Sequence, residues 1–359
     1  MKSILRFIGI VVLGVSIGAT NLAAQTLSGV VIDEHGDPAI GASVYLDGTS
    51  IGCSADAYGH YSLTVKEPVN TNLVVSMVGY QTVVLANPFQ HPVQKIVLQP
   101  TTVEIKALVV TGDGFSRKQK LRIFRRQLLG NTQAGRRCRI LNEEVVTFSY
   151  SKRDKLLEAM ASKPLVIFNP YLGYKVTFDM VEFQVKFSDN TLLNNSMSGS
   201  YFLGTIFFKD DKEPNGKEEI HRANCYDGSA LDFFRAMRDH TWKQRQFELI
   251  SGGSLISPDS CFTVSDSAEY KKVTVLKRKL RGLVLSGNPL TNSTINLGIV
   301  YRRREQSFVV FRTKTFYLDS YGNNSEPSKI SFGGELGAKR LGDMLPLDYV
   351  KHPKATVKH

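Results

Sequence analysis

The stretch that decides the fold of the first part of the chain is residues 28–48, SGVVIDEHGDPAIGASVYLDG. Apolar residues at Val30–Ile32 and Ala42–Leu46 are each followed by turn residues, first Glu34–Pro38 and then Asp47-Gly48. Asp, Gly and Pro favour turns because they accept a positive or a preset φ. The stretch therefore predicts two short β-strands, each ended by its own turn.

Further short strands are expected up to residue 98. They are Tyr61–Val65, Leu73–Val78, Gln81–Leu85 and Lys95–Leu98. About seven strands at a spacing of about 8–12 residues are typical of a small β-sandwich. We therefore expect an antiparallel sandwich in the first part of the chain.

Five motifs of this region, in this order, resemble the carboxypeptidase-regulatory-like domain. They are Ser28–Asp33, Gly36–Val44, Gly48-Thr49, Gly59–Tyr61 and Ser76–Tyr80. The resemblance implies a transthyretin-like β-sandwich, common in exported Bacteroidetes proteins and at the N-terminus of TonB-dependent nutrient transporters. It covers about a fifth of the chain.

Weaker resemblances follow this region. Val109–Gly112 resembles the segment that comes after the domain in those transporters. Phe124–Gly130, Cys138–Asn142 and Leu345–Tyr349 resemble stand-alone Bacteroidetes proteins that carry the domain. These resemblances imply no activity.

The N-terminus has the three parts of a secretory signal. Lys2 and Arg6 precede the apolar run Phe7–Ala19, and small residues end the segment near Ala24. No Cys lies near that position, so we expect export without a lipid anchor, to the periplasm or the outer membrane. The signal peptide is expected to span residues 1–24.

The rest of the chain predicts one β-rich α+β domain. We expect the sandwich at 25–99, a linker at 100–115, the α+β domain at 116–350 and a basic tail at 351–359. Within the domain, Leu121, Phe124 and Leu128 recur with helical spacing, which predicts an amphipathic helix over Ser116–Leu129. A second helix is expected to begin at Ser229 and to run through Trp242, with a short one near Ala338–Met344. Strands fill most of the remainder.

Charge is distributed unevenly along the chain. The sequence carries a formal net charge of +12, yet residues 25–98 hold two Lys against six acidic residues. A basic body of this kind favours anionic partners. In an exported protein these are anionic envelope lipids and glycans rather than nucleic acid, and outer-membrane or periplasmic proteins are further candidate partners.

The strongest candidate contact residues lie on the first predicted helix. Ser116–Arg139 contains nine Lys or Arg and no acidic residue. Lys118, Arg122, Arg125 and Arg126 fall on the face opposite the apolar residues, so we expect them to bind an anion or an anionic surface. The runs Lys277–Lys279 and Arg302–Arg304 are further basic candidates.

Motifs for catalysis or metal binding are absent from the sequence. The seven His show no zinc-peptidase spacing, and no P-loop or G-x-S-x-G motif occurs. We therefore expect no catalytic residues, no metal and no cofactor. Two alternatives stay open: a dispersed site formed by Cys225 with His221 and His240, and a calcium ion held by acidic turn residues, which are Asp33, Asp37 and Asp56. The four Cys allow three complete pairings.

These observations favour a non-enzymatic binding or assembly module of the cell envelope. An envelope hydrolase with a dispersed active site is one alternative. An accessory component of a TonB-dependent nutrient-uptake system is another.

Overall fold

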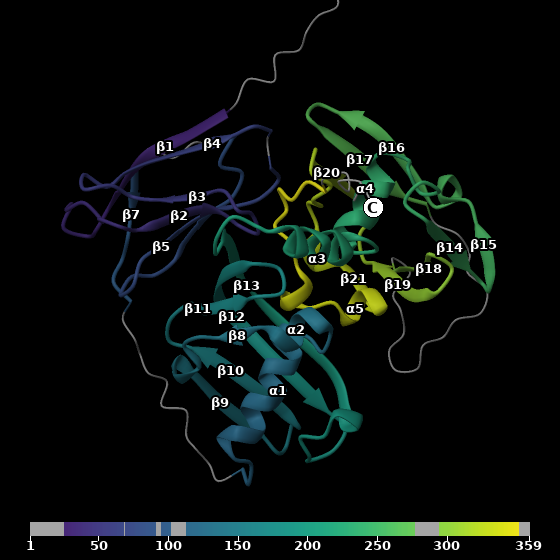
Figure 1. Ribbon diagram of the computed structural model, residues 1–359, viewed down its shortest axis with the longest axis horizontal. Coiled ribbons are helices and arrows are strands. Elements are labelled where there is room, and N and C mark those ends of the chain that lie inside the picture. Colours follow the sequence, from purple (N-terminus) through teal and green to yellow (C-terminus); the bar gives the residue numbers. More distant parts are fainter. Residues whose placement is uncertain (1–24, 68, 91–94, 102–112, 277–293, 352–359) are drawn as a thin grey trace, which may run out of the picture.

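The computed structural model describes residues 25–67, 69–90, 95–101, 113–276 and 294–351. These residues form three units, each with its own cluster of buried apolar side chains. We call them the sandwich (within residues 25–97), the helix-backed sheet (within residues 117–226) and the aromatic unit (within residues 230–334). They lie around the last described residues of the chain, which are yellow in Figure 1. The predicted signal peptide, the segment Val109–Gly112 and most of the basic tail lie outside the described residues.

The sandwich consists of two small sheets that enclose one core. One sheet has the order β4-β1-β7 and the other β3-β2-β5-β6. The strands are β1 (Gln25–Ile32), β2 (Ser43–Leu46), β3 (Gly52–Ser54), β4 (His60–Val65), β5 (Leu73–Ser76), β6 (Val83–Leu85) and β7 (Lys95–Val97). Val31, Val44 and Val65 are fully buried between the sheets. The predicted all-β sandwich is thereby confirmed.

One pairing in the sandwich differs from the antiparallel expectation. Strand β7 runs parallel to β1, with Val31 opposite Ile96. The two strands lie far apart in the chain, and β7 enters from the opposite sheet after β6 rather than through a hairpin. The other strand pairs of both sheets are antiparallel.

The helix-backed sheet follows. Six strands pair in the order β8-β11-β12-β10-β9, with β13 on the other side of β12. They are β8 (Arg139–Ile140), β9 (Val146–Ser151), β10 (Leu156–Ala161), β11 (Leu165–Asn169), β12 (Tyr174–Phe187) and β13 (Met197–Asp210). The helices α1 (Arg117–Leu129), α2 (Gln133–Arg137) and α3 (Gly216–Tyr226) pack with it. Helix α3 was not expected from the sequence.

Helix α1 confirms the amphipathic helix predicted for Ser116–Leu129. Ser116 caps its N-terminus in a capping box with Gln119. Phe124 and Leu128 are fully buried. The ring of Phe124 makes edge contacts with Phe148 and Phe183 of the sheet. The apolar face of α1 is therefore part of the core.

The aromatic unit has a second, separate core. One of its sheets has the order β15-β14-β18-β19-β21 and the other β16-β17-β20. The strands are β14 (Phe247–Ser251), β15 (Ser254–Ile256), β16 (Phe262–Ser267), β17 (Tyr270–Val275), β18 (Ile295–Tyr301), β19 (Glu305–Phe311), β20 (Thr315–Leu318) and β21 (Ile330–Gly334). Phe233 of α4 (Ala230–Arg238) makes ring contacts with Trp242, Phe247 and Phe332. The region expected as one domain thus contains two hydrophobic cores.

The second predicted helix begins where expected and ends earlier. The Ser229 side chain accepts a hydrogen bond from the Asp232 backbone and caps α4. The helix ends at Arg238, and Trp242 lies in the turn that leads to β14. Near the C-terminus, the short predicted helix is present as α5 (Glu335–Ala338) and a 3-10 turn, Leu341–Asp343.

The three units are joined by specific polar contacts. The backbone of Gly48 in the sandwich donates to Ile206 of β13 (2.6 Å), and Phe208 donates back to Thr49 (3.0 Å). Leu347 near the C-terminus donates to Gly48 (2.8 Å). Asn70 of the sandwich donates to the Asp319 carboxylate of the aromatic unit (2.7 Å). The sandwich is therefore docked on the body and is not a loosely tethered domain.

Candidate functional site

The cationic face of α1 is exposed, as the sequence predicts. Lys118, Arg122, Arg125 and Arg126 all lie in exposed positions. Arg125 forms an ion pair with Glu143, in the turn that precedes β9. The other three have no ion-pair partner among the residues that the structure describes. The four residues, which we call the α1 basic face, thus present three uncompensated cations to solvent.

Two other cations of the same segment are structural. Lys120 is buried, and its ammonium pairs with Asp113 at 2.5 Å. Burial alone favours the neutral form of Asp113, but the hydrogen bond and the charge of Lys120 leave its pKa lowered overall. Arg117 donates to the carbonyls of Val146 and Glu143. A count of basic residues therefore overstates the charge that is free to bind a partner.

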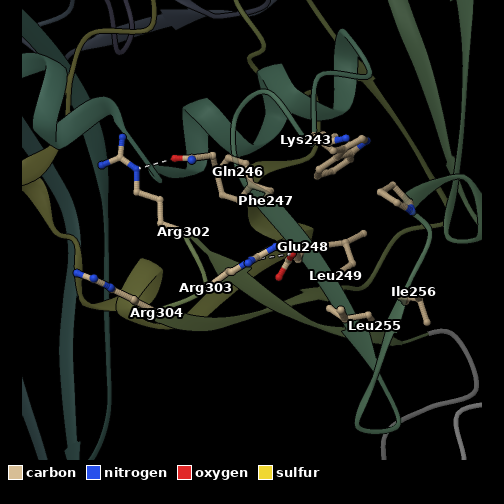
Figure 2. Close-up of a pocket in the computed structure, with 12 residues that line it drawn as sticks. Lys243, Gln246, Phe247, Glu248, Leu249, Leu255, Ile256, Arg302, Arg303 and Arg304 are labelled. Carbon is tan, nitrogen blue, oxygen red and sulfur yellow. Dashed lines mark hydrogen bonds and ion pairs between the residues drawn. The ribbon is translucent and has the colours of Figure 1, made fainter.

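The run Arg302–Arg304 lies in the connection between β18 and β19. Its backbone turns tightly at Tyr301–Arg304, closed by a hydrogen bond from the Arg304 amide to the Tyr301 carbonyl (3.1 Å). We call this segment the arginine turn. It borders an open pocket of about 800 Å³, the walls of which come from β14, β15 and the turn after α4 (Figure 2). The sequence predicted the three arginines as a basic candidate site, but it did not predict the pocket. The other run, Lys277–Lys279, lies outside the described residues.

No hydrogen bond joins Cys225 to His221 in the described part of the chain. The two residues lie one turn apart on α3, but His221 Nδ1 bonds to the Tyr171 carbonyl (2.8 Å). The His221 ring also stacks on the Tyr171 ring at 3.7 Å between centroids. Burial raises the pKa of Cys225 to about 12, so its thiol is protonated at neutral pH. His240 is exposed near Asp259.

Two of the three acidic turn residues of the sandwich, Asp33 and Asp56, accept hydrogen bonds from the backbone of their own turns. Asp33 accepts hydrogen bonds from the amides of His35 and Asp37, each at 2.9 Å. Asp56 accepts from Tyr58 and His60 in the same way. These bonds account for Asp at both positions as a turn-forming residue.

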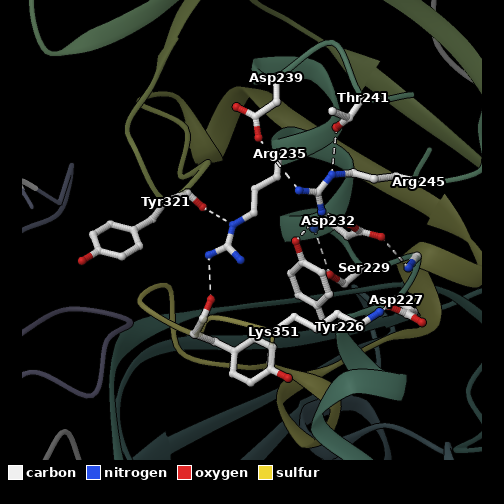
Figure 3. A network of polar contacts seen from close by, with 12 residues as sticks. Tyr226, Asp227, Ser229, Asp232, Arg235, Asp239, Thr241, Arg245, Tyr321 and Lys351 are labelled. Carbon is white, nitrogen blue, oxygen red and sulfur yellow. Dashed lines mark hydrogen bonds and ion pairs between the residues drawn. The ribbon is translucent and has the colours of Figure 1, made fainter. Parts of the chain in front are cut away.

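A network of polar contacts around α4 has a structural role (Figure 3). Asp232 is buried and accepts hydrogen bonds from the Gly228 amide and the Arg245 guanidinium (3.0 and 2.6 Å). Arg235 donates to the carbonyls of Tyr321 and Tyr349 (2.6 and 2.8 Å). The network therefore ties α4 to Tyr321 and Tyr349. Asp232 is paired with Arg245, and the Arg235 guanidinium is hydrogen-bonded to backbone carbonyls.

Two further findings concern membrane-spanning helices and the similarity of the chain to known proteins. Within the described ranges, no helix combines the length and apolar character needed to cross a bilayer. Residues 27–110 match the family described as CarboxypepD_reg-like domain, in agreement with the observed sandwich. The chain is also 33% identical over 99 residues to the TonB-dependent receptor SusC of Bacteroides thetaiotaomicron. That match covers 27% of this chain and only 9% of the receptor, so the similarity concerns a small part of each protein.

Proposed function

We propose that this protein is a non-enzymatic module of the bacterial cell envelope that works beside a TonB-dependent outer-membrane receptor. The domain match and the partial similarity to SusC support an envelope location. The signal-like N-terminus agrees with export. In this proposal the sandwich is the part that the protein shares with such a receptor, and the body contacts the surrounding surface.

The observation that carries the proposal is the α1 basic face. Phe124 fixes the helix in the core, while Lys118, Arg122 and Arg126 are exposed and form no ion pair within the described ranges. Each cation close to an anionic membrane surface contributes about 1 kcal/mol of binding. Three cations on a rigid helix therefore supply a salt-sensitive contact with an anionic surface.

Vesicle sedimentation tests this contact. The protein should sediment with phosphatidylcholine vesicles that contain phosphatidylglycerol, and added salt should release it. R122S/R126S should weaken the association about thirtyfold, because two cations are lost. K209S/K217S removes two exposed cations elsewhere on the body and serves as the matched control. Equal effects of the two double variants would mean that general charge, and not the α1 basic face, binds the vesicle.

Fractionation and cross-linking test the location and the partner. The protein should be found in the envelope fraction, beginning near Gln25, and cross-link to a TonB-dependent receptor. A soluble cytoplasmic protein with an intact Met1 would refute the envelope assignment.

A further inference from the structure

The pocket beside the arginine turn carries a strong excess of positive charge. Its lining includes four cations, Lys243, Arg302, Arg303 and Arg304, against one carboxylate, Glu248. Such a concentration attracts an anion, and guanidinium groups bind phosphate or carboxylate through paired hydrogen bonds.

The cations differ in how far they are already engaged. Arg302 pairs with Asp227 (2.7 Å) and donates to the Gln246 side chain (3.0 Å), so it has a structural role. The Arg303 side chain is 87% exposed and reaches Glu248 only at 3.8 Å. Arg304 and Lys243 have no ion-pair partner in the described part of the chain. Three cations of the pocket are therefore available to a ligand.

The backbone around the pocket is strained. Arg302 and Arg303 have φ values of +49° and +56°, the sign that both central residues of a type I′ turn need. Gly and Asn adopt this conformation readily, whereas a long side chain is disfavoured in it. Gln246, on the facing wall, is also left-handed at +61°. Three of the seven non-glycine residues with positive φ in the described ranges thus line this pocket, and such clustering marks functional sites.

Apart from Gln246, the rest of the lining is apolar. Leu255 is 65% exposed, and Figure 2 shows Leu255 and Ile256 on the opposite side from the arginines. Pro258 belongs to the same lining. Trp242 contributes to the same lining. A ligand that fits both parts has an anionic group for Arg303 and Arg304 and a hydrocarbon portion for the apolar wall.

We propose that this pocket binds a small amphiphile with a phosphate head group and a hydrocarbon chain. The arginine turn holds the phosphate, and Leu255, Ile256 and Trp242 contact the chain. The head group can belong to a free amphiphile or to a membrane lipid, and the chemistry recognised is the same. This site is separate from the α1 basic face. An experiment can therefore refute the proposal for one site without refuting the proposal for the other.

Tryptophan fluorescence reports on this site directly. The sequence contains one Trp, and that residue is Trp242 in the pocket lining. Titration with monomeric dodecyl phosphate should shift or quench its emission, whereas neutral dodecyl maltoside and inorganic phosphate alone should have much weaker effects. Vesicles with phosphatidylglycerol should produce the same change if the pocket takes its ligand from a membrane; a change with dodecyl phosphate but not with vesicles would identify the free amphiphile.

Variants of the turn separate binding from stability. R303G should weaken dodecyl phosphate binding about tenfold through loss of a charged hydrogen bond. It should also raise the melting temperature by about 2 °C, because glycine relieves the left-handed backbone. R304S should weaken binding similarly, and R122S on α1 should leave it unchanged. The proposal is overturned if R303G and R304S bind dodecyl phosphate as the unmodified protein does, or if the maltoside binds equally well.

Discussion

Replacement of Asp47 by Asn should stabilise the protein at neutral pH. Asp47 begins the sandwich turn that docks on β13, and its Oδ1 accepts a hydrogen bond from the Ile206 amide at 2.7 Å. Burial raises the pKa of Asp47 from 3.8 to about 6, even though backbone hydrogen bonds from Ile206 and Gly48 lower it. The ionised carboxylate is therefore an unfavourable group at this junction.

The size of the effect on stability and its pH range follow from the raised pKa of Asp47. The rise in the pKa of Asp47 from 3.8 to about 6 corresponds to about 3 kcal/mol. Because the pKa of Asp47 is higher in the folded than in the unfolded protein, folding takes up a proton at pH values between these two pKa values. The stabilising contribution is complete below about pH 4 and is lost as pH rises through about 6. Asn keeps an oxygen that accepts from Ile206 but carries no charge, so D47N should gain up to about 3 kcal/mol near pH 8 and almost nothing near pH 4.

Thermal unfolding followed by circular dichroism at the two pH values measures this difference. D47A is the matched control, because it removes both the charge and the acceptor. It leaves the Ile206 amide unpaired, which costs about 1–3 kcal/mol, and this cost should be present at both pH values. If D47N unfolds at a lower temperature than the unmodified protein near pH 8, the ionised carboxylate stabilises the junction and the reasoning is wrong.

Three further outcomes are expected. F124A should lower the stability of the body by about 3–5 kcal/mol because the ring is fully buried, whereas R122S should leave the melting temperature nearly unchanged; thermal scans of both variants measure this. Cys138 and Cys225 should resist iodoacetamide near pH 8 in the native protein and react in urea, since burial raises the pKa of each to about 12; mass spectrometry that finds fast native labelling would contradict it. Residues 25–101 expressed alone should melt cooperatively as a β-protein, since their core is separate, and a random-coil spectrum would exclude this.

Local patterns were sufficient for the sandwich and for α1. In the sandwich, periodicity and turn chemistry place every strand except the three-residue β3 without knowledge of distant contacts, because the strands are short and end at their own turn residues. In α1, the apolar spacing of Phe124 and Leu128 and the cap at Ser116 act within one helix. The orientation of the Lys118, Arg122, Arg125 and Arg126 side chains followed from the same periodicity, because residues opposite a buried stripe face solvent.

Other features depend on long-range contacts that periodicity does not encode. Helix α3 had a local signal, since Asn215 and Glu218 form a capping box, but its apolar stripe is weak and was not recognised. The division of the body into two cores depends on which strands pair, and the pocket arises only where the arginine turn meets β14 and β15. The parallel pairing of β7 with β1 likewise joins segments far apart in the sequence.

Asp47 and Arg303 both occupy positions that a more stable sequence would fill differently, and the comparison between them indicates where function lies. The unfavourable burial of Asp47 has a structural reason, because its carboxylate satisfies the Ile206 amide and fixes the sandwich to the body. The turn between β18 and β19 needs a left-handed backbone at Arg303, but it does not need an arginine there: the side chain is almost fully exposed and its ion pair is long. A residue type that is unfavourable for its backbone conformation, and that forms no stabilising contact in return, is expected at a binding site. The arginine turn fulfils this condition, whereas the junction at Asp47 is explained by folding alone.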